Sequence, residues 1–111
     1  MNDIIVAPAT APGGALGVVR LSGPGCADTV LRFLRKPAPG SGTLELPERR
    51  SVLAEALDGG ETLDRVLAVR FAPGRSYTGE EMVELSAHGS SFVMDRLAAL
   101  ACLHGARPAR P

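Results

Sequence analysis

Apolar and polar side chains alternate most clearly between Met82 and His88. Successive residues of a strand point to opposite faces, so Val83, Leu85 and Ala87 share one face that can pack against a helix. The opposite face carries the remaining side chains of the segment: Met82, Glu84, Ser86 and His88. A half-exposed strand with a solvated face shows the same alternation. The strand also runs directly into a predicted helix, whose first amides suit an anionic ligand group. The pattern therefore predicts a two-faced strand, and both a structural and a ligand-binding role stay open for its polar side.

Four other segments have the composition and alternation of strands: residues 3–7, 16–22, 51–58 and 63–71. A loop rich in glycine and proline joins the first two. Asp58-Gly59-Gly60-Glu61 is typical of the tight turn of a hairpin and joins the last two. In the last strand, Leu67, Val69 and Phe71 form one apolar face.

Two segments repeat apolar residues with the period of a helix. The first helix is predicted over residues 25–35 from the stripe Ala27, Val30, Leu31 and Leu34. The second is predicted over residues 90–104 from the stripe Val93, Leu97, Leu100 and Ala101. Gly105 is a suitable C-terminal stop for the second helix.

The order β-β-α-β-β-β-α predicts one α/β (α+β) domain over residues 1–111, a mixed β-sheet with two helices on one face. The other face of the sheet then meets solvent, a ligand or another protein. Residues 37–47 are rich in proline, glycine and serine and are predicted to form a mobile loop. The tail, residues 106–111, has two prolines and no periodicity, and we expect it to be the start of a longer chain.

The charges of the chain balance, with 12 Lys and Arg against 12 Asp and Glu and a pI near 6.7. No global basic field is therefore available to hold nucleic acid by its phosphates. Local basic runs occur at Arg32, Arg35 and Lys36 and at Arg107 and Arg110. Such runs are typical of helix ends and solvated tails.

Cysteine use and the absence of long apolar runs indicate a cytoplasmic protein. Cys26 and Cys102 each lie in a predicted helix, which favours free thiols in a reducing compartment. Cys102 and His104 are two residues apart on a helix and point in different directions, so we predict no metal site. The N-terminus lacks the features of a secretion signal, and no run of about 20 apolar residues could cross a membrane.

Arg20 is unusual within its predicted strand. It shares a face with Leu16, Val18 and Ser22, where a guanidinium is costly unless it is paired or reaches water. One interpretation is an arginine that extends to solvent at a strand edge. The other is a pairing with Glu84 or with an acidic ligand group, because the planar guanidinium binds carboxylates through two hydrogen bonds.

Four blocks of the sequence carry a resemblance to a known family: residues 4–7 with 9–13, residues 17–24, residues 76–89 and residues 105–111. Ser-Tyr-Thr-Gly-Glu at 76–80 and Glu84-Leu85-x-x-His88-Gly89 are the most specific of these. The blocks resemble the N-terminal domain of the tRNA-modifying GTPases called MnmE or TrmE, over nearly the whole chain.

The resemblance implies a fold like the tetrahydrofolate-binding fold of aminomethyltransferases. It implies a homodimer that binds 5-formyltetrahydrofolate or methylenetetrahydrofolate through the positions of Arg20 and Glu84, with no catalytic residue in this domain. The parent proteins modify the wobble uridine of certain tRNAs together with the FAD-dependent MnmG (GidA) protein. GTP, Mg and K would bind only in the GTPase module, which this chain lacks, so we expect no catalysis from the chain alone.

The chain departs from the family pattern in three places. The glycine loop between Thr10 and Arg20 is one residue short, Ser90 replaces a usual second glycine, and the chain stops at residue 111, before the helical domain. A dimerisation and assembly module with a vestigial folate site is therefore a second hypothesis. An independent aminomethyl-transferring enzyme is disfavoured, because Glu84 and His88 are the sole candidate acid/base pair.

Overall fold

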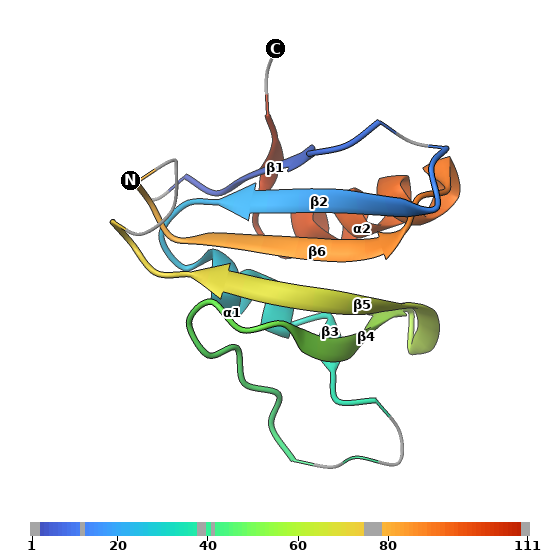
Figure 1. Cartoon of the computed structure of the whole chain (residues 1–111), viewed down its shortest axis with the longest axis horizontal. Helices are drawn as coiled ribbons and strands as arrows, with labels where there is room; N and C mark the ends of the chain where they lie inside the picture. Colours follow the sequence, from blue (N-terminus) through green and yellow to red (C-terminus); the bar gives the residue numbers. More distant parts are fainter. Residues whose placement is uncertain (1–2, 12, 38–39, 41, 75–78, 110–111) are drawn as a thin grey trace.

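The computed structural model describes residues 3–11, 13–37, 40, 42–74 and 79–109. In this part of the chain, seven strands and two helices form one layer of sheet and one layer of helix (Figure 1). Their bounds are β1 (Ile5–Pro8), β2 (Leu16–Ser22), α1 (Cys26–Leu31), β3 (Leu34–Arg35), β4 (Val52–Asp58), β5 (Glu61–Phe71), β6 (Met82–His88), α2 (Ser91–Leu103) and β7 (Arg107–Pro108).

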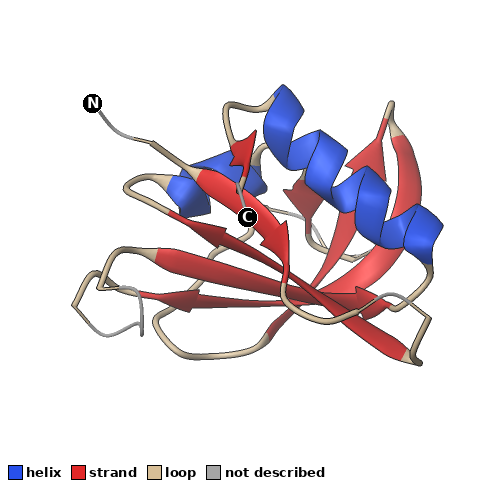
Figure 2. Ribbon diagram, turned by 90° about the horizontal axis from the view of Figure 1, so that it is seen from above, coloured by secondary structure: helices blue, strands red, loops and turns tan. Residues whose placement is uncertain are grey.

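The strands lie in the order β3-β4-β5-β6-β2-β1-β7. All neighbours are antiparallel except β1 and β7, which are parallel, so the sheet is mixed as predicted. Figure 2 shows α1 and α2 on the same side of the sheet. The prediction of two helices on one face is confirmed, and the other face of the sheet carries no helix.

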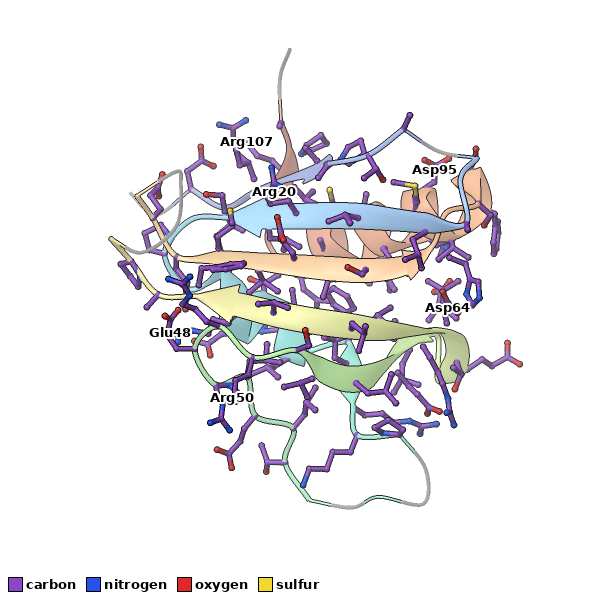
Figure 3. The ribbon with its side chains drawn as sticks, in the orientation of Figure 1. Arg20, Glu48, Arg50, Asp64, Asp95 and Arg107 are labelled. Carbon is purple, nitrogen blue, oxygen red and sulfur yellow. The ribbon has the colours of Figure 1, made fainter. Side chains whose placement is uncertain are left out.

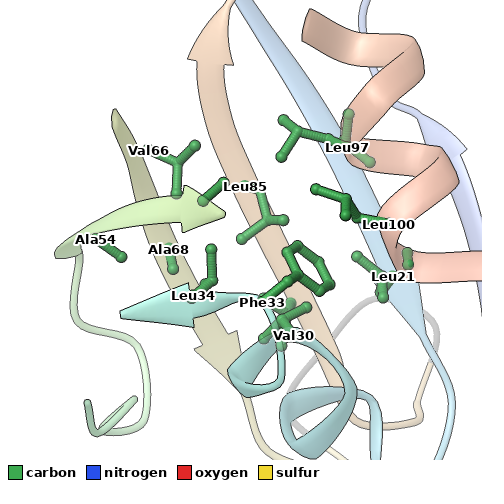
Figure 4. Packing of buried hydrophobic residues seen from close by; sticks show 14 of the residues in the cluster. Leu21, Val30, Phe33, Leu34, Ala54, Val66, Ala68, Leu85, Leu97 and Leu100 are labelled. Carbon is green, nitrogen blue, oxygen red and sulfur yellow. The ribbon is translucent and has the colours of Figure 1, made fainter. Parts of the chain in front are cut away.

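The core fills the space between the sheet and the two helices (Figure 4). Val83, Leu85 and Ala87 of β6 are buried there, which confirms the apolar side of the predicted two-faced strand. Leu97 of α2 and Val30 of α1 are fully buried against them. Burying an aliphatic side chain of this size contributes about 1.5–3 kcal/mol, so these contacts fix which face of each strand points inward.

The hairpin of β4 and β5 turns the predicted apolar set of β5 away from the helices. Val66 and Ala68 face the core, so Leu67, Val69 and Phe71 lie on the helix-free face. The three residues do share one face, as the sequence predicts. Their side of the sheet depends on the pairing of β5 with β6, in which Val69 lies opposite Glu84.

The first helix is shorter than predicted. The apolar period continues to Leu34, but α1 ends at Leu31 and Leu34 pairs with Ala56 in the sheet. The amide of Leu57 donates to the carbonyl of Phe33 at 2.8 Å, so hydrogen bonds to β4 replace the next turn of helix. Strand pairing at the sheet edge therefore overrides the local helical period.

The predicted aperiodic tail contains a strand. Arg107 and Pro108 pair with Ile5 and Val6 of β1, and the guanidinium of Arg107 donates to Asp3 at 2.8 Å. This hydrogen bond is the main cause of a lowered pKa of the Asp3 carboxyl, and the charge of Arg107 lowers that pKa further. Local periodicity gives no sign of this strand, because its pairing partner lies about a hundred positions away in the sequence.

The predicted mobile loop is anchored at its C-terminal half. Leu44 and Leu46 are buried in the core cluster, while residues 38, 39 and 41 lie outside the described part of the chain. The second helix matches its prediction closely, since the Ser90 hydroxyl accepts from the amide of Val93 and so caps α2.

Gly89 joins β6 to α2 at a close approach of two backbones. The amide of Gly13 donates to its carbonyl at 2.7 Å, and a Cβ at position 89 would overlap the carbonyl of Gly14. The short glycine loop therefore packs directly on the strand end, and its position depends on the absence of a side chain at residue 89.

Replacing Gly89 with alanine should destabilise the fold by about 1–3 kcal/mol, because the overlap falls on backbone atoms that cannot rotate away. Urea unfolding measures the loss. Gly14→Ala is the matched control, since its Cβ would meet the nearest atom at an ordinary 3.6 Å and should change stability by less than about 0.5 kcal/mol. Equal effects of the two substitutions would contradict the packing role of Gly89.

Candidate functional site

Arg20 and Glu84 meet at the centre of the helix-free face. They are direct cross-strand neighbours in the β2–β6 pairing. Arg20 Nε donates to Glu84 Oε2 at 2.9 Å and Nη2 donates to the same oxygen at 2.6 Å. The two side chains are 27% and 26% exposed. Of the two interpretations of Arg20, the pairing with Glu84 is the one that the structure has, and Figure 3 views this face with Arg20 labelled.

Apolar side chains surround the pair. In the same cross-strand row, Ala7 lies beside Arg20 and Val69 beside Glu84. One row along, Val18 lies opposite Ser86. The pair therefore has apolar neighbours on both sides in its own cross-strand row, which suits a flat ring with a few polar edge atoms.

The hydrogen bonding of Glu84 leaves capacity for a ligand. Both of these donors of Arg20 reach Oε2, and no residue in the described part of the chain donates to Oε1. A carboxylate offers about four acceptor positions, so Glu84 can accept two further N–H groups while Arg20 holds it in place. The described part of the site has the chemistry of recognition.

His88 does not join this pair. It lies four residues further along β6, about 13 Å from Glu84 by the rise of a strand. Its Nδ1 lies 2.8 Å from Asp64 Oδ1, and its backbone amide donates to Asp64 Oδ2 at 3.0 Å. Sequence reasoning missed Asp64, because only the pairing of β5 with β6 brings it to the end of the strand.

A cavity of about 390 Å³ opens next to the pair, one row along the sheet. Its walls come from four separate segments of the chain: Asp3, Ile5, Ser22, Pro24, Glu80 and Arg107. Ser22 and Arg20 lie on the same face of β2, so the cavity extends the surface around the ion pair. Residues 76–78 of the Ser-Tyr-Thr-Gly-Glu block lie outside the described part of the chain.

A second polar cluster, centred on Glu81, lies at the start of β6. Glu81, directly before β6, is buried, accepts from Arg70 Nε at 2.9 Å and accepts from the amide of Gly25 at 2.8 Å. It thereby ties β5 and β6 to the start of α1. Burial, and secondly the charge of Glu81, raise the pKa of the nearby Cys26 thiol to about 12, so this cysteine is unreactive.

Within the residues that the structure describes, no group of three His, Cys, Asp or Glu side chains could hold a metal ion. Cys26 and Cys102 are free thiols. The ring of His104 stacks on Phe33 at a centroid distance of 5.9 Å, which gives this histidine a packing role. Neither helix in the described ranges has the length and apolar composition needed to cross a bilayer.

Comparison with known proteins identifies relatives over the whole chain. Residues 4–111 match the family described as the GTP-binding protein TrmE N-terminus. Three relatives are each called tRNA modification GTPase MnmE. The chain is 43% identical to that of Koribacter versatilis, 42% to that of Thermus thermophilus and 47% to that of Alkalilimnicola ehrlichii, over 96–100% of its own length. It spans about a quarter of the length of each relative, from 23% to 25%.

The ion pair should contribute little to stability, because a partly exposed pair typically contributes about 0–1 kcal/mol. Glu84→Gln should therefore cost less than about 1 kcal/mol in urea unfolding. Leu85→Ala is the control on the opposite side of the same strand and should cost about 2–5 kcal/mol, since Leu85 is fully buried. A loss for Glu84→Gln as large as that for Leu85→Ala would mean that the pair is structural.

Proposed function

The chain belongs to the family of GTP-binding protein TrmE N-terminal domains, and on this basis we propose that it binds a reduced one-carbon folate through Arg20 and Glu84. The ligand would be 5-formyltetrahydrofolate or methylenetetrahydrofolate. The observation that carries the proposal is the Arg20–Glu84 pair at the centre of a helix-free, largely apolar sheet face.

The donor set of this pair suits a pterin ring. The 2-amino group and the neighbouring ring N–H form an edge with two donors, which the available acceptor positions of Glu84 can meet. The guanidinium of Arg20 can donate to a ring carbonyl or to a carboxylate of the ligand. Val18 and Val69 would lie against the flat faces of the ring.

The rest of the proposed function concerns a longer protein. The relatives are tRNA modification GTPases of about four times this length, and the chain contains no P-loop sequence. We place it as the N-terminal domain of a cytoplasmic GTPase that modifies tRNA wobble uridine with an FAD-dependent partner. A mixed sheet with both helices on one face is compatible with the folate-binding fold of aminomethyltransferases.

Calorimetric titration with 5-formyltetrahydrofolate tests the site. We expect a dissociation constant in the micromolar range or weaker, about −8 kcal/mol or less favourable, since the chain tested spans about a quarter of the length of its relatives. Glu84→Ala should abolish the heat of binding, because it removes the acceptor for the pterin edge. Glu61→Ala, at the exposed hairpin tip, is the control and should bind as the unchanged chain does. Unaltered binding by Glu84→Ala would exclude the proposed site.

The exposed apolar side chains of the helix-free face favour a second candidate, a dimerisation and assembly module. Leu16 is 70% exposed, Leu53 44% and Leu67 45%, and all three lie on this face. Such a surface is typical of a protein interface. In both candidates the chain forms a homodimer through this face, and only the role of the ligand differs.

Sedimentation velocity with and without 5-formyltetrahydrofolate separates the two candidates. If folate binds at the interface, the ligand should shift the monomer–dimer equilibrium toward the dimer by linkage. If the folate site is vestigial, the dimer should form to the same extent in both samples. Leu67→Asp should weaken the dimer in either case, because it places a charge on the apolar face. If the chain sediments as a monomer with and without the ligand, and Leu67→Asp changes nothing, the proposed interface is contradicted.

A further inference from the structure

Four cations have no ion-pair partner among the described residues, and all four come from one stretch of the chain. They are Arg32, Lys36, Arg49 and Arg50. Every other arginine that the structure describes is paired with a carboxylate: Arg20, Arg35, Arg65, Arg70, Arg96 and Arg107. The chain as a whole is neutral, yet residues 32–50 hold five cations and two acids. The positive charge of this protein is therefore concentrated in one region.

Two further arginines extend this region onto the sheet. Arg35 of β3 and Arg65 of β5 share one carboxylate, that of the buried Glu55, at 3.1 Å and 3.5 Å. Both arginines are about half exposed, at 49% and 59%. The three residues are direct neighbours across β3, β4 and β5, so one acid sits between two cations. The triad keeps an excess positive charge at the surface.

The backbone presents Arg49 and Arg50 to solvent. Arg49 has a φ of 62°, which is uncommon for a residue with a side chain. Its amide donates to the carbonyl of Arg70 at 2.7 Å, and this bond holds the turn against β5. Glu48 could have neutralised its neighbours, but its carboxylate accepts from the amide of Ala72 at 2.6 Å. Figure 3 shows Arg50 at the edge of the sheet opposite to Arg107.

Helix capping accounts for only one of these basic residues. The sequence suggested that Arg32, Arg35 and Lys36 complement the end of a helix; Arg32 is the C-cap residue of α1, and the last turn itself has no basic residue. Arg35 lies in β3 and Lys36 follows it, both exposed. We name the six exposed residues of this region the basic edge: Arg32, Arg35, Lys36, Arg49, Arg50 and Arg65.

We propose that the basic edge binds the phosphodiester backbone of a structured RNA. The six cations come from three separate segments, residues 32–36, 49–50 and 65, and four of them have no carboxylate partner among the described residues, so no single small anion meets them all. A chain of phosphates meets such spread charges and releases its counterions on binding. The choice of RNA rests on the proposed function in tRNA modification. The surface reads charge and not sequence, so it would orient the RNA and leave base recognition to other parts.

Fluorescence anisotropy with a labelled tRNA transcript and this chain tests the proposal over a salt series. Four to six phosphate contacts predict a slope of about −4 or steeper in log K against log salt, a loss of affinity of about 250-fold or more between roughly 50 and 200 mM. Arg49→Gln/Arg50→Gln should reduce the slope by about two and weaken binding at least about tenfold. Urea unfolding of each variant establishes that it is folded.

The matched comparison is Arg50→Gln against Arg96→Gln, which remove the same charge from different places. Arg96 is paired with Asp58 on the helix side, and its loss should leave the salt slope unchanged. Equal weakening by the two variants, or wild-type binding by Arg49→Gln/Arg50→Gln, would overturn the proposal. If polyglutamate competes as effectively as unlabelled RNA at equal charge, the RNA proposal is overturned in favour of an acidic protein partner. Calorimetric titration of the double variant with 5-formyltetrahydrofolate separates this test from that of the proposed folate site. The double variant should bind folate as the unchanged chain does.

Discussion

The pairing of β2 with β6 is the constraint on which the rest of this structure depends. Val19 and Leu21 of β2, and Val83 and Leu85 of β6, point toward the helices and are fully buried. Because side chains alternate, the same register places Arg20 opposite Glu84 on the other face. A slip of one residue would exchange the faces and bury both charges. The core thus positions the candidate site, although the site itself contributes little to stability.

The two faces of the sheet carry different functions. The helix side is a closed apolar core, while the helix-free side combines a central ion pair, an apolar surround and an adjoining cavity. Glu81 links these layers, since its buried carboxylate holds the start of α1 and the end of β5. Recognition groups can therefore occupy one face without disturbing the packing that maintains the other.

Charge is distributed as unevenly as polarity. Ion pairs join elements across the molecule, such as Arg96 with Asp58 and Arg107 with Asp3, and they neutralise most arginines locally. Arg32, Lys36, Arg49 and Arg50 lack such partners among the described residues, in part because the carboxylate of Glu48 bonds to the backbone. The formal net charge is zero because acidic residues elsewhere in the chain balance the positive charge of the basic edge. The Arg20–Glu84 pair lies on β2 and β6, whereas none of the residues of the basic edge does, so a ligand at the pair need not displace a partner at the basic edge.

Local pattern predicted much of the fold and both residues of the central pair. The strands β2 and β6 and the helix α2 follow from alternation, period and capping, which depend on near neighbours in the sequence. Arg20 and Glu84 stood out because each is a charge on a strand, and the family motifs contain them. Local pattern is a poorer guide where a residue pairs with a partner far along the chain. Leu34 continues the helical period of α1 but pairs with Ala56 in the sheet.

The sequence by itself determined the two-faced character of the strands, since side-chain alternation is a local property of an extended backbone. Only the tertiary structure decided which groups meet. Asp64 reaches His88 through the register of β5 with β6, and Arg107 reaches Asp3 across 104 positions. The isolation of Arg49 and Arg50 is likewise a tertiary fact, because whether a charge is paired depends on every chain segment that passes near it.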